Sequence, residues 1–340
     1  LDEIILNEIQ VNSEISYQDK DFNYFPKFKH SWEEVDRELF SENNVLSNVD
    51  KNIISEVKFN KIHYNNLLNN SHNLISDELY YLNIIKDVLN NGEERKTRNS
   101  ITRSQFGLRM EFNDINIKFP LLTTKKVFWK GIVEELLWFI SANTNSKDLE
   151  KKGVKIWKGN SSREYLDQNG LNEYCDGDCG PIYGFQWRHF NAVYNGMDKN
   201  YENKGIDQLK NCIELIKNNP TSRRIFMTAW NPCQINEMVL PPCHVSYQFY
   251  VRDENKLDCQ MYQRSGDLFL GVPFNIASTA LLTSLIAKVT NKIPGKIIII
   301  LGDAHIYNNH IEQIKLQLKR KPYEFPTLNI KKINENINDY

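Results

Sequence analysis

A cysteine lies between two prolines and a histidine in the stretch LPPCHVSYQFYV, residues 240–251. After Cys243 the residue types alternate, with apolar side chains at every second position from Val245 to Val251. This alternation predicts a half-buried strand, and proline restricts the backbone where the strand begins. A thiol held at a fixed place is suited to nucleophilic attack, because the attacking group must be oriented toward its target.

A cysteine nucleophile reacts as the thiolate, so its pKa matters. A free thiol has a pKa near 8.5, and neighbouring cations lower that value. One pKa unit corresponds to about 1.4 kcal/mol, which one or two partly buried arginines could supply. The segment YQRSGD, residues 262–267, contains Arg264 and is predicted to form a turn just past the partner strand. We therefore expect a cation beside Cys243 and a lowered thiol pKa.

A pair of arginines begins another predicted strand. Arg223 and Arg224 lie in TSRR, residues 221–224, and the planar guanidinium group is well suited to binding a phosphate. An exposed, solvated pair explains the same pattern equally well. Adjacent strand residues point to opposite faces, so both arginines could reach one ligand only at an irregular strand end or across an interface.

Two further segments could carry polar chemistry. EELLWF places Glu135 on an apolar helix, where it is either at the water edge or a proton carrier. GDAHIYNNH places His305 and Tyr307 after a hydrophobic strand, where they could bind sugar hydroxyls or cap the following helix. Neither HxxxE nor HExxH spacing accompanies them, so no metal site is predicted.

The other cysteines predict neither a metal site nor a disulfide framework. Cys175 and Cys179, in CDGDC, could form a metal clip, but no second such pair exists, and a Gly- and Asp-rich loop is the preferred interpretation. Cys212 and Cys259 fall in a predicted helix and on the apolar side of a predicted strand, so we expect both in the core. Scattered cysteines are typical of a reducing cytoplasm, which is the predicted location.

The composition excludes several classes of protein. The 340 residues include 42 basic and 43 acidic side chains with a net charge of −1, whereas a large nucleic-acid footprint would show a basic excess. The longest apolar run, IIIIL at residues 297–301, is too short to span a membrane. The first residues, LDEIILNEIQ, lack the basic region of a signal peptide.

The predicted elements indicate an α+β fold with a large mixed sheet packed against helices. Residues 1–68 contain strand-like pieces, FNYFPKF and EVKFNKIHY, and a polar loop, SENNVLSNVDKN. An Asn-rich junction follows at residues 69–76, and a helix begins near residue 77 with Leu79, Leu82, Ile85 and Leu89 on one face. Further strands are predicted at 104–112, 223–230, 240–251, 256–263 and 296–305, and further helices at 130–142, 207–219, 275–290 and 310–320.

Six of these segments together resemble one family, thymidylate synthase. They are FPLLTTKKVFWKGIVEELLWF, GPIYGFQWRHF, NPTSRRIFMTAWN, LPPCHVSYQFYV, YQRSGDLFLGVPFNIAS and LGDAHIYNNHIEQIKLQL. The resemblance covers residues 77–340 nearly without a break. It implies the fold of that family, a large mixed sheet packed against helices, and a homodimer formed through the sheet.

The first part of the chain resembles the carboxyl-terminal strands of dihydrofolate reductase, in DEIILNEI, DFNYFPKF and EVKFNKIHY. The order of reductase, Asn-rich junction and synthase is similar to that of a bifunctional enzyme. Residues 1–68 are therefore predicted to be a reductase remnant, 69–76 a junction and 77–340 a synthase domain. NADPH would serve only the absent reductase part, and no reductase activity is expected from this sequence.

The resemblance implies the reductive methylation of dUMP to dTMP, with 5,10-methylenetetrahydrofolate as one-carbon and hydride donor. The Cys243 thiolate would add to C6 of the uracil, which makes C5 nucleophilic toward the methylene carbon. This chemistry needs no metal and no nicotinamide. The implied partners are dUMP, the folate and a second copy of the chain, and neither a membrane nor a nucleic acid is expected.

The resemblance also assigns roles to individual residues. The catalytic set would be Cys243, Glu135, Tyr183, His244, Arg264 and Asn275. The dUMP site would contain Arg98, Arg223, Arg224, His244, Gln263, Arg264, Ser265, Gly266, Asp267, Asn275, His305, Ile306 and Tyr307, with Arg223 and Arg224 coming from the second subunit. The folate site would contain Phe128, Ile156, Trp157, Asp267, Leu270, Gly271 and Phe274.

The sequence departs from the family pattern in two places. The phosphate loop is Thr97-Arg98-Asn99-Ser100, where the family has Asp-Arg-Thr-Gly. Family members also continue past the equivalent of INDY with a segment that closes over the folate, so that segment is expected to be missing. Two alternatives remain: a pyrimidine nucleotide hydroxymethylase, which has aspartate in place of Asn275, and a non-catalytic nucleotide- or RNA-binding relative.

Overall fold

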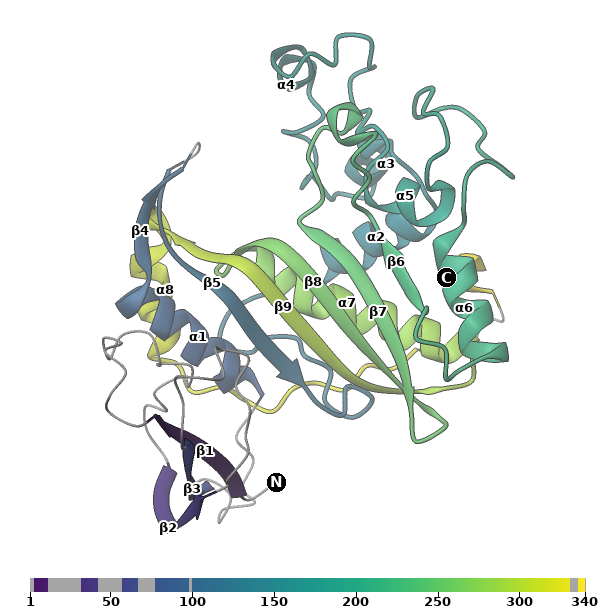
Figure 1. Cartoon of the computed structure of the whole chain (residues 1–340). Coiled ribbons are helices and arrows are strands. Elements are labelled where there is room, and N and C mark those ends of the chain that lie inside the picture. The colour runs from purple at the N-terminus through teal and green to yellow at the C-terminus, as the bar shows by residue number, and fades with distance from the viewer. Residues whose placement is uncertain are drawn as a thin grey trace, which may run out of the picture. The chain divides into compact units, whose positions relative to one another are not determined.

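A computed structural model of the chain describes residues 77–97, 100–330 and 336–339, together with three strands among the first 76 residues. The chain divides into two compact units, residues 1–75 and residues 76–340. Figure 1 labels the elements of both units. The residues that could do chemistry all belong to the second unit, and Arg98 alone among them lies outside the described residues.

The described part of the first unit is an antiparallel sheet. Its strands are β1 (Glu3–Val11), β2 (Trp32–Ser41) and β3 (Val57–Asn66), and β3 pairs with both of the others. The prediction of a strand in EVKFNKIHY is confirmed by β3. The predicted strand FNYFPKF and the loop predicted after Ser41 lie outside the described residues.

The second unit is built on a six-stranded mixed sheet with the order β4-β5-β9-β8-β7-β6. Only the central pair, β8 and β9, is parallel, and the other neighbours are antiparallel. The predicted α+β arrangement with a mixed sheet is therefore confirmed. The strands are β4 (Glu93–Lys96), β5 (Ile101–Phe112), β6 (Phe226–Thr228), β7 (His244–Arg252), β8 (Lys256–Asp267) and β9 (Ile293–Tyr307).

Two of the sequence predictions about these strands are wrong. YQRSGD does not form a turn, because it is the end of β8, and its residues pair with β9 as far as Asp267 opposite His305. β9 contains His305, as the strand predicted at 296–305 did, but it continues to Tyr307, which was predicted to follow the strand. Both strands continue through polar residues because they pair with each other as far as Asp267 and His305, and this pairing supplies partners for the backbone. In contrast, the strand predicted at 223–230 is reduced to the three residues of β6.

Helices cover one face of this sheet and one of its ends. α7 packs on β8 and β9, and α1 packs on β5, while α2 contacts both α5 and α7. Figure 1 shows α7 behind the sheet and α2, α3, α4 and α5 grouped at its upper end. The predicted helices are confirmed as α1 (Glu78–Asn91), α2 (Trp129–Ile140), α6 (Gln208–Asn218), α7 (Gly271–Val289) and α8 (Ile311–Leu318), and α3 (Ser146–Lys151), α4 (Arg163–Gln168) and α5 (Tyr183–His189) are additional.

α7 is the central core helix. By length and composition alone it could cross a membrane, but 83% of that stretch is buried inside the domain. Its hydroxyl groups donate to carbonyls four residues earlier, for example Thr283 Oγ1 to Thr279 O at 2.8 Å and Ser284 Oγ to Ala280 O at 2.8 Å. These polar side chains are therefore satisfied within the helix, and its apolar surface is explained by packing against the sheet.

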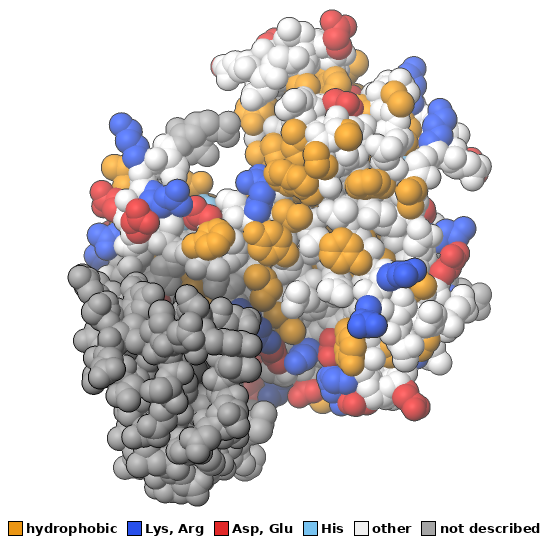
Figure 2. Space-filling model, viewed as in Figure 1, with side chains coloured by type: hydrophobic (Ala, Val, Ile, Leu, Met, Phe, Trp, Pro, Cys, Tyr) orange, Lys and Arg blue, Asp and Glu red, His pale blue; other side chains and the backbone are white. Residues whose placement is uncertain are grey.

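The sheet face opposite α7 carries exposed aromatic side chains. Phe226, Tyr250 and Tyr262 are 47%, 63% and 37% exposed, and each alternates with a buried residue of the same strand. Figure 2 shows hydrophobic side chains gathered over this part of the sheet. Exposed apolar patches of this kind are typical of a protein–protein interface.

Candidate active site

The backbone around Cys243 is held by hydrogen bonds from two other elements. The Cys243 N–H donates to Tyr183 Oη at 2.8 Å, and the Cys243 carbonyl accepts from the Arg264 N–H at 2.9 Å. The Arg264 guanidinium donates to the carbonyls of Pro241 and Pro242 at 2.8 and 2.9 Å. Proline has a fixed φ, and these bonds also occupy the proline carbonyls, so the thiol is held at a fixed place one residue before β7.

The pKa of the Cys243 thiol is raised above its usual value by burial, and the nearby Arg264 charge and Tyr183 hydroxyl act in the opposite direction. The predicted cation is therefore present, but the predicted net lowering of the pKa is wrong for the protein without a ligand. Burial disfavours the charged form of any acid. The Arg264 charge and the Tyr183 hydroxyl oppose this effect, but burial is the larger influence.

Glu135 is a buried carboxyl group that, like Cys243, lies near Tyr183. Glu135 is 7% exposed on α2, and its Oε1 accepts from Trp157 Nε1 at 2.7 Å. Burial raises the pKa of Glu135 to about 7, and the Trp157 hydrogen bond opposes that rise. Of the two sequence interpretations, the water-edge position is therefore wrong. A carboxyl group with a pKa near neutrality can both give and take a proton, as proton-transfer catalysts must.

Four aromatic rings connect Glu135 to the cysteine strand. Trp157 lies 5.9 Å from Tyr183 between ring centroids, and Tyr183 lies 4.6 Å from His244. Phe139, one turn after Glu135 on α2, stacks on Tyr183 at 4.8 Å. A Cβ on Gly184 would meet the Phe139 carbonyl oxygen at 2.1 Å. Only glycine permits this close approach of α5 to α2, which sets the Tyr183 hydroxyl against the cysteine.

Asn275 is oriented by a chain of hydrogen bonds. Gln263 Nε2 donates to the Ser265 carbonyl at 2.9 Å and to Asn275 Oδ1 at 3.0 Å, and Asn275 Nδ2 lies 3.0 Å from His244 Nε2. A backbone carbonyl can only accept, so the Gln263 atom facing Ser265 must be its nitrogen. Asn275 must then present its oxygen to Gln263 and its nitrogen to His244. The amide orientation thus follows from the network.

A cleft of about 310 Å³ opens beside this network at the ends of β8 and β9. Arg264 and Ser265 line it from β8, and His305 Nδ1 lies 3.2 Å from Asp303 Oδ1 on β9. Arginine, serine and histidine side chains are suited to a phosphorylated sugar. The complete lining is Thr97, Thr102, Arg264, Ser265, Asp303, His305 and Tyr307.

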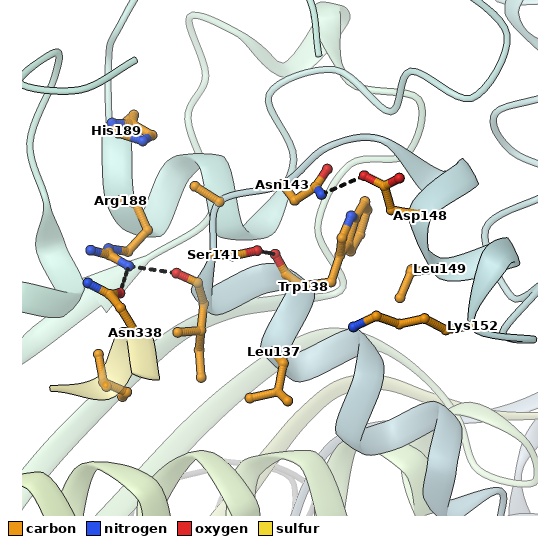
Figure 3. A pocket seen from close by; sticks show the side chains of 13 residues that line it. Leu137, Trp138, Ser141, Asn143, Asp148, Leu149, Lys152, Arg188, His189 and Asn338 are labelled. Carbon is orange, nitrogen blue, oxygen red and sulfur yellow. Dashed lines mark hydrogen bonds between the residues drawn. The ribbon is translucent and has the colours of Figure 1, made fainter. Parts of the chain in front are cut away.

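The helices that carry Glu135 and Tyr183 are joined at their far ends. Arg188, in the last turn of α5, donates to the Ile140 carbonyl at the end of α2 and to Asn338 Oδ1, each at 2.6 Å. The same guanidinium pairs with Asp207 at 2.9 Å. Figure 3 shows this junction at one side of a cavity of about 550 Å³. None of the predicted site residues lines this cavity. The Arg188 hydrogen bond to the Ile140 carbonyl links the ends of α5 and α2.

A sequence model described as thymidylate synthase matches residues 79–340, which is more than half of the chain. The chain belongs to the thymidylate synthase family. It is 52% identical to bifunctional dihydrofolate reductase-thymidylate synthase 1 of Arabidopsis thaliana, over 78% of this chain and 51% of that protein. It is also 51% identical to the bifunctional dihydrofolate reductase-thymidylate synthase of Plasmodium berghei, over 91% of this chain and 51% of that protein.

The third relative is the bifunctional dihydrofolate reductase-thymidylate synthase of Paramecium tetraurelia, 50% identical over 89% of this chain and 67% of that protein. The chain spans about half the length of the Arabidopsis and Plasmodium relatives. The Plasmodium match is longer than the stretch from residue 77 to the end, so it includes part of the first 76 residues.

Of the thirteen residues that the thymidylate synthase resemblance assigned to dUMP, Arg264, Ser265, His305 and Tyr307 line the cleft, and His244, Gln263 and Asn275 form the hydrogen-bonded chain beside it. Ile306 is fully buried, so only its backbone could face a ligand. A Cβ on Gly266 would lie 3.0 Å from a Val272 methyl group, which explains glycine there by packing. Arg98 is outside the described residues, and its role stays a prediction.

Of the residues assigned to folate, Asp267 and Trp157 have side-chain hydrogen bonds that connect them to other parts of the site. Asp267 Oδ1 accepts from the N–H groups of Phe269 and Leu270 at 2.9 and 3.3 Å, at the start of α7. Trp157 donates from Nε1 to Glu135 Oε1, as described above. The rest stay predictions: Phe128, Ile156 and Leu270 are exposed apolar side chains, and Gly271 and Phe274 form the first turn of α7.

Arg223 and Arg224 are exposed on a turn before β6, away from the cleft of the same chain. Phe226 pairs with Gln248 on β7, which pairs with Gln260 on β8. Gln260 precedes Ser265 by five positions, which is roughly 16 Å at about 3.3 Å per residue. Because β6 runs toward the cleft and the arginines precede it, they are farther away still.

Sequence reasoning did not single out Asp303 or Tyr247. Asp303 lies in the quoted segment GDAHIYNNH, and its Oδ1 is 3.2 Å from His305 Nδ1. An acidic residue two positions before a histidine in a predicted strand could have indicated this contact. Tyr247 lies three residues after His244, and its Oη is 3.3 Å from His244 Nδ1. Regular alternation would place these two residues on opposite faces, so the sequence contained no signal for this contact.

Within the part of the chain that the structure describes, no group of three or more His, Cys, Asp or Glu side chains could hold a metal ion. Cys175 and Cys179 lie in a turn-rich loop, in which Asp178 accepts from Tyr194 Oη at 2.6 Å and from the Gly180 N–H at 2.9 Å. Cys212 and Cys259 are buried core residues, as predicted.

Proposed function

We propose that residues 77–340 catalyse the reductive methylation of dUMP to dTMP with 5,10-methylenetetrahydrofolate. The observation that carries the proposal is the fixed Cys243 thiol beside Arg264, with the buried Glu135 carboxyl and the oriented Asn275 amide around it. The thiolate adds to C6 of the uracil, C5 bonds to the methylene carbon, and the C5 proton leaves. The electron pair released at C5 expels the folate nitrogen from the methylene carbon, which leaves an exocyclic methylene on the nucleotide and tetrahydrofolate. Hydride transfer from this tetrahydrofolate then completes the methyl group, expels the thiolate from C6 and yields dihydrofolate.

The Asn275 amide supports uracil as the base. Its Oδ1 and Nδ2 each retain capacity for one more hydrogen bond after serving Gln263 and His244. Uracil offers an acceptor at O4 and a donor at N3, which match an amide nitrogen and oxygen. Cytosine has a donor, its amino group, in place of O4 and an acceptor at N3. In the same amide orientation, Asn275 Nδ2 would face the amino group and Oδ1 would face N3, so neither hydrogen bond could form.

The test of this function is the absorbance change that accompanies dihydrofolate formation. The protein, dUMP and 5,10-methylenetetrahydrofolate should give dTMP and dihydrofolate in equal amounts. A hydroxymethylated nucleotide without dihydrofolate would instead establish the hydroxymethylase reaction. Binding of dUMP with no product from either reaction would contradict both enzymatic assignments.

Asn275→Asp should shift base preference toward cytosine. A carboxylate cannot donate to O4 unless it is protonated, and a hydrogen bond lost from a buried polar group costs about 1–3 kcal/mol. We expect the ratio of dUMP to dCMP affinity, measured by calorimetry, to fall by at least about tenfold. An unchanged ratio would show that Asn275 does not read the base.

We also propose a homodimer in which Arg223 and Arg224 of one subunit bind the dUMP phosphate in the other. The exposed face formed by Phe226, Tyr250 and Tyr262 supports association through the sheet. The arginines precede Phe226, whose level in the sheet lies roughly 16 Å from Ser265 of the same chain. An arginine side chain cannot span that distance, so a second subunit would have to supply them.

Subunit mixing tests the shared site. Cys243→Ser and Arg223→Ala should each be inactive or severely impaired alone, yet their mixture should recover activity. One of the two hybrid sites then has an intact cysteine and an intact arginine, so after complete exchange about a quarter of all sites should work. The mixture is assayed after subunit exchange has been demonstrated by native mass spectrometry. Exchange without recovered activity would contradict the shared site.

We propose that residues 1–68 are the carboxyl-terminal strands of a dihydrofolate reductase domain. Their antiparallel order β1-β3-β2 and the reach of the Plasmodium match into this segment support the assignment. NADPH would then belong to the reductase reaction and not to the synthase. The six free cysteines support a cytoplasmic location.

A further inference from the structure

Tyr247 and His244 face the same side of β7 because the strand is irregular between them. The register shifts between His244 and Ser246, so that His244 opposes Gln263 and Ser246 opposes Tyr262. One extra residue therefore bulges out of the strand and reverses the alternation. As a result both His244 and Tyr247 are buried, 7% and 2% exposed, and Tyr247 Oη lies 3.3 Å from His244 Nδ1.

The position of the His244 proton follows from the hydrogen bonds around it. The carbonyl of Ser265 fixes the Gln263 amide, and Gln263 in turn fixes the amide of Asn275. Asn275 therefore turns its NH2 group toward His244 Nε2 at 3.0 Å. An NH2 group needs an acceptor, so Nε2 must be unprotonated. In a neutral imidazole the proton is then on Nδ1, and the Tyr247 oxygen is its acceptor.

The surroundings of His244 keep the ring neutral. It is packed among the aromatic rings of Phe139, Tyr183 and Tyr247, with centroid distances of 6.4, 4.6 and 6.4 Å. Burial lowers the pKa of His244 to about 4. At neutral pH the ring therefore carries one proton. If that proton is on Nδ1, Nε2 can accept a hydrogen bond from the Asn275 NH2 group; if it is on Nε2, two donors face each other there.

We propose that the Tyr247 hydroxyl is a positioning group for base recognition, which holds the His244 proton on Nδ1 and so keeps the Asn275 amide in the orientation that selects uracil. This inference rests on the proposed function, because it concerns how the same site distinguishes uracil from cytosine. Gln263 fixes Asn275 from one side, and Tyr247 fixes it from the other through His244. Tyr247 itself need not touch the nucleotide.

Removal of the Tyr247 hydroxyl should change the hydrogen bonds on the His244 side of Asn275 and leave those on the Gln263 side in place. Without the Tyr247 oxygen, the Nδ1–H tautomer of His244 loses its acceptor, while the Nε2–H tautomer loses nothing on that side. When Nε2 carries the proton, it faces the Asn275 NH2 group donor to donor. The Asn275 amide would then turn over in part of the molecules, and the turned amide is complementary to cytosine.

The direct test is the tautomer of His244, measured by nitrogen NMR on protein with 15N-labelled histidine. The seven histidines are assigned with His244→Gln, which removes one pair of signals. We expect Nδ1 protonated and Nε2 unprotonated at pH 7 in the unsubstituted protein. In Tyr247→Phe we expect the Nε2–H form to be populated. A His244 ring protonated on Nε2 in the unsubstituted protein would overturn the inference, even if no variant could be made.

The functional test compares dUMP and dCMP affinity by calorimetry in Tyr247→Phe and in a control. We expect the dUMP to dCMP affinity ratio to fall about tenfold, the scale of one buried hydrogen bond. Tyr201→Phe is the control, because Tyr201 is also buried and its Oη also bonds, to the Gly196 carbonyl at 2.9 Å, outside the site. Its ratio should not change.

Each outcome has a distinct meaning. A changed ratio in Tyr247→Phe with an unchanged His244 tautomer would overturn the inference, as would a changed tautomer with an unchanged ratio. An equal fall in Tyr201→Phe would also overturn it. Failure of the proposed function is separate, because it would appear as absent dihydrofolate formation from dUMP in the unsubstituted protein whatever the tautomer of His244.

Discussion

Cys243→Ser should lower dTMP formation by at least about a thousandfold while leaving dUMP affinity within about threefold. Removal of a covalent nucleophile usually costs several orders of magnitude in turnover, and a serine hydroxyl is far less acidic than a thiol. The binding contacts lie elsewhere, in the cleft lined by Arg264, Ser265 and His305 and at the Asn275 amide. Turnover is measured from dihydrofolate absorbance and dUMP affinity by calorimetry.

The control for this substitution is Cys233→Ser. Cys233 is a free cysteine that is exposed, so its replacement should change neither turnover nor affinity. If Cys243→Ser retained turnover within about tenfold of the unsubstituted protein, covalent catalysis by Cys243 would be contradicted. If instead dUMP affinity were lost together with turnover, Cys243 would be a binding residue and its nucleophilic role would lose its support.

Glu135→Gln should lower turnover by about 100- to 10,000-fold, the range associated with loss of a general acid–base group. Glutamine has nearly the same shape and can still accept from Trp157 Nε1, so only the proton-transfer capacity is removed. Because the pKa of Glu135 is about 7, the activity of the unsubstituted protein should change slope near pH 7. That inflection should be absent from the pH profile of the variant.

The same substitution should stabilise the fold above neutral pH. Below the ordinary glutamate pKa of 4.5, the carboxyl is protonated in both the folded and the unfolded chain. Between pH 4.5 and about 7 the unfolded chain releases the proton and the folded chain keeps it, so the free energy of unfolding falls as pH rises. Above pH 7 there is no further change from this group.

Glutamine does not titrate, so the free energy of unfolding of the variant does not fall with pH for this reason. Urea unfolding at pH 5 and pH 8 should show that Glu135→Gln gains about 2–3 kcal/mol relative to the unsubstituted protein between the two pH values. Groups shared by both proteins cancel in this comparison. An equal pH dependence of the two proteins would mean that Glu135 is ionised in the fold and that its proposed role in proton transfer is wrong.

The mixed sheet and its main helices could be predicted from the sequence because each has a clear local pattern. α1 has apolar residues at helical spacing up to Gly92, and β7 alternates strictly after Ser246. The ends of β8 and β9 could not be predicted in the same way. Polar residues such as Arg264 and Asp303 stay in strands there because parallel pairing supplies backbone partners, and pairing between distant segments leaves no local signal.

The candidate site shows the same division. The position of Cys243 beside an arginine could be predicted from proline and arginine spacing, but the net effect on the thiol pKa depends on how deeply the fold buries it. Glu135 lay on an apolar helix in the sequence, yet only the packing of α2 decided that it is buried. The Tyr247 contact with His244 arises from a bulge in β7, and a bulge is a property of two strands that one strand's sequence does not reveal.

The central claim is that Cys243 bonds covalently to the pyrimidine, and the mass of a trapped complex tests it most directly. 5-Fluoro-dUMP carries no proton at C5, so after addition of the thiolate and of the methylene carbon the reaction cannot proceed. Mixed with this nucleotide and 5,10-methylenetetrahydrofolate, the protein should gain the mass of both molecules, and peptide mapping should place them on Cys243. A chain of unchanged mass, or an adduct on another residue such as Cys233, would contradict the account.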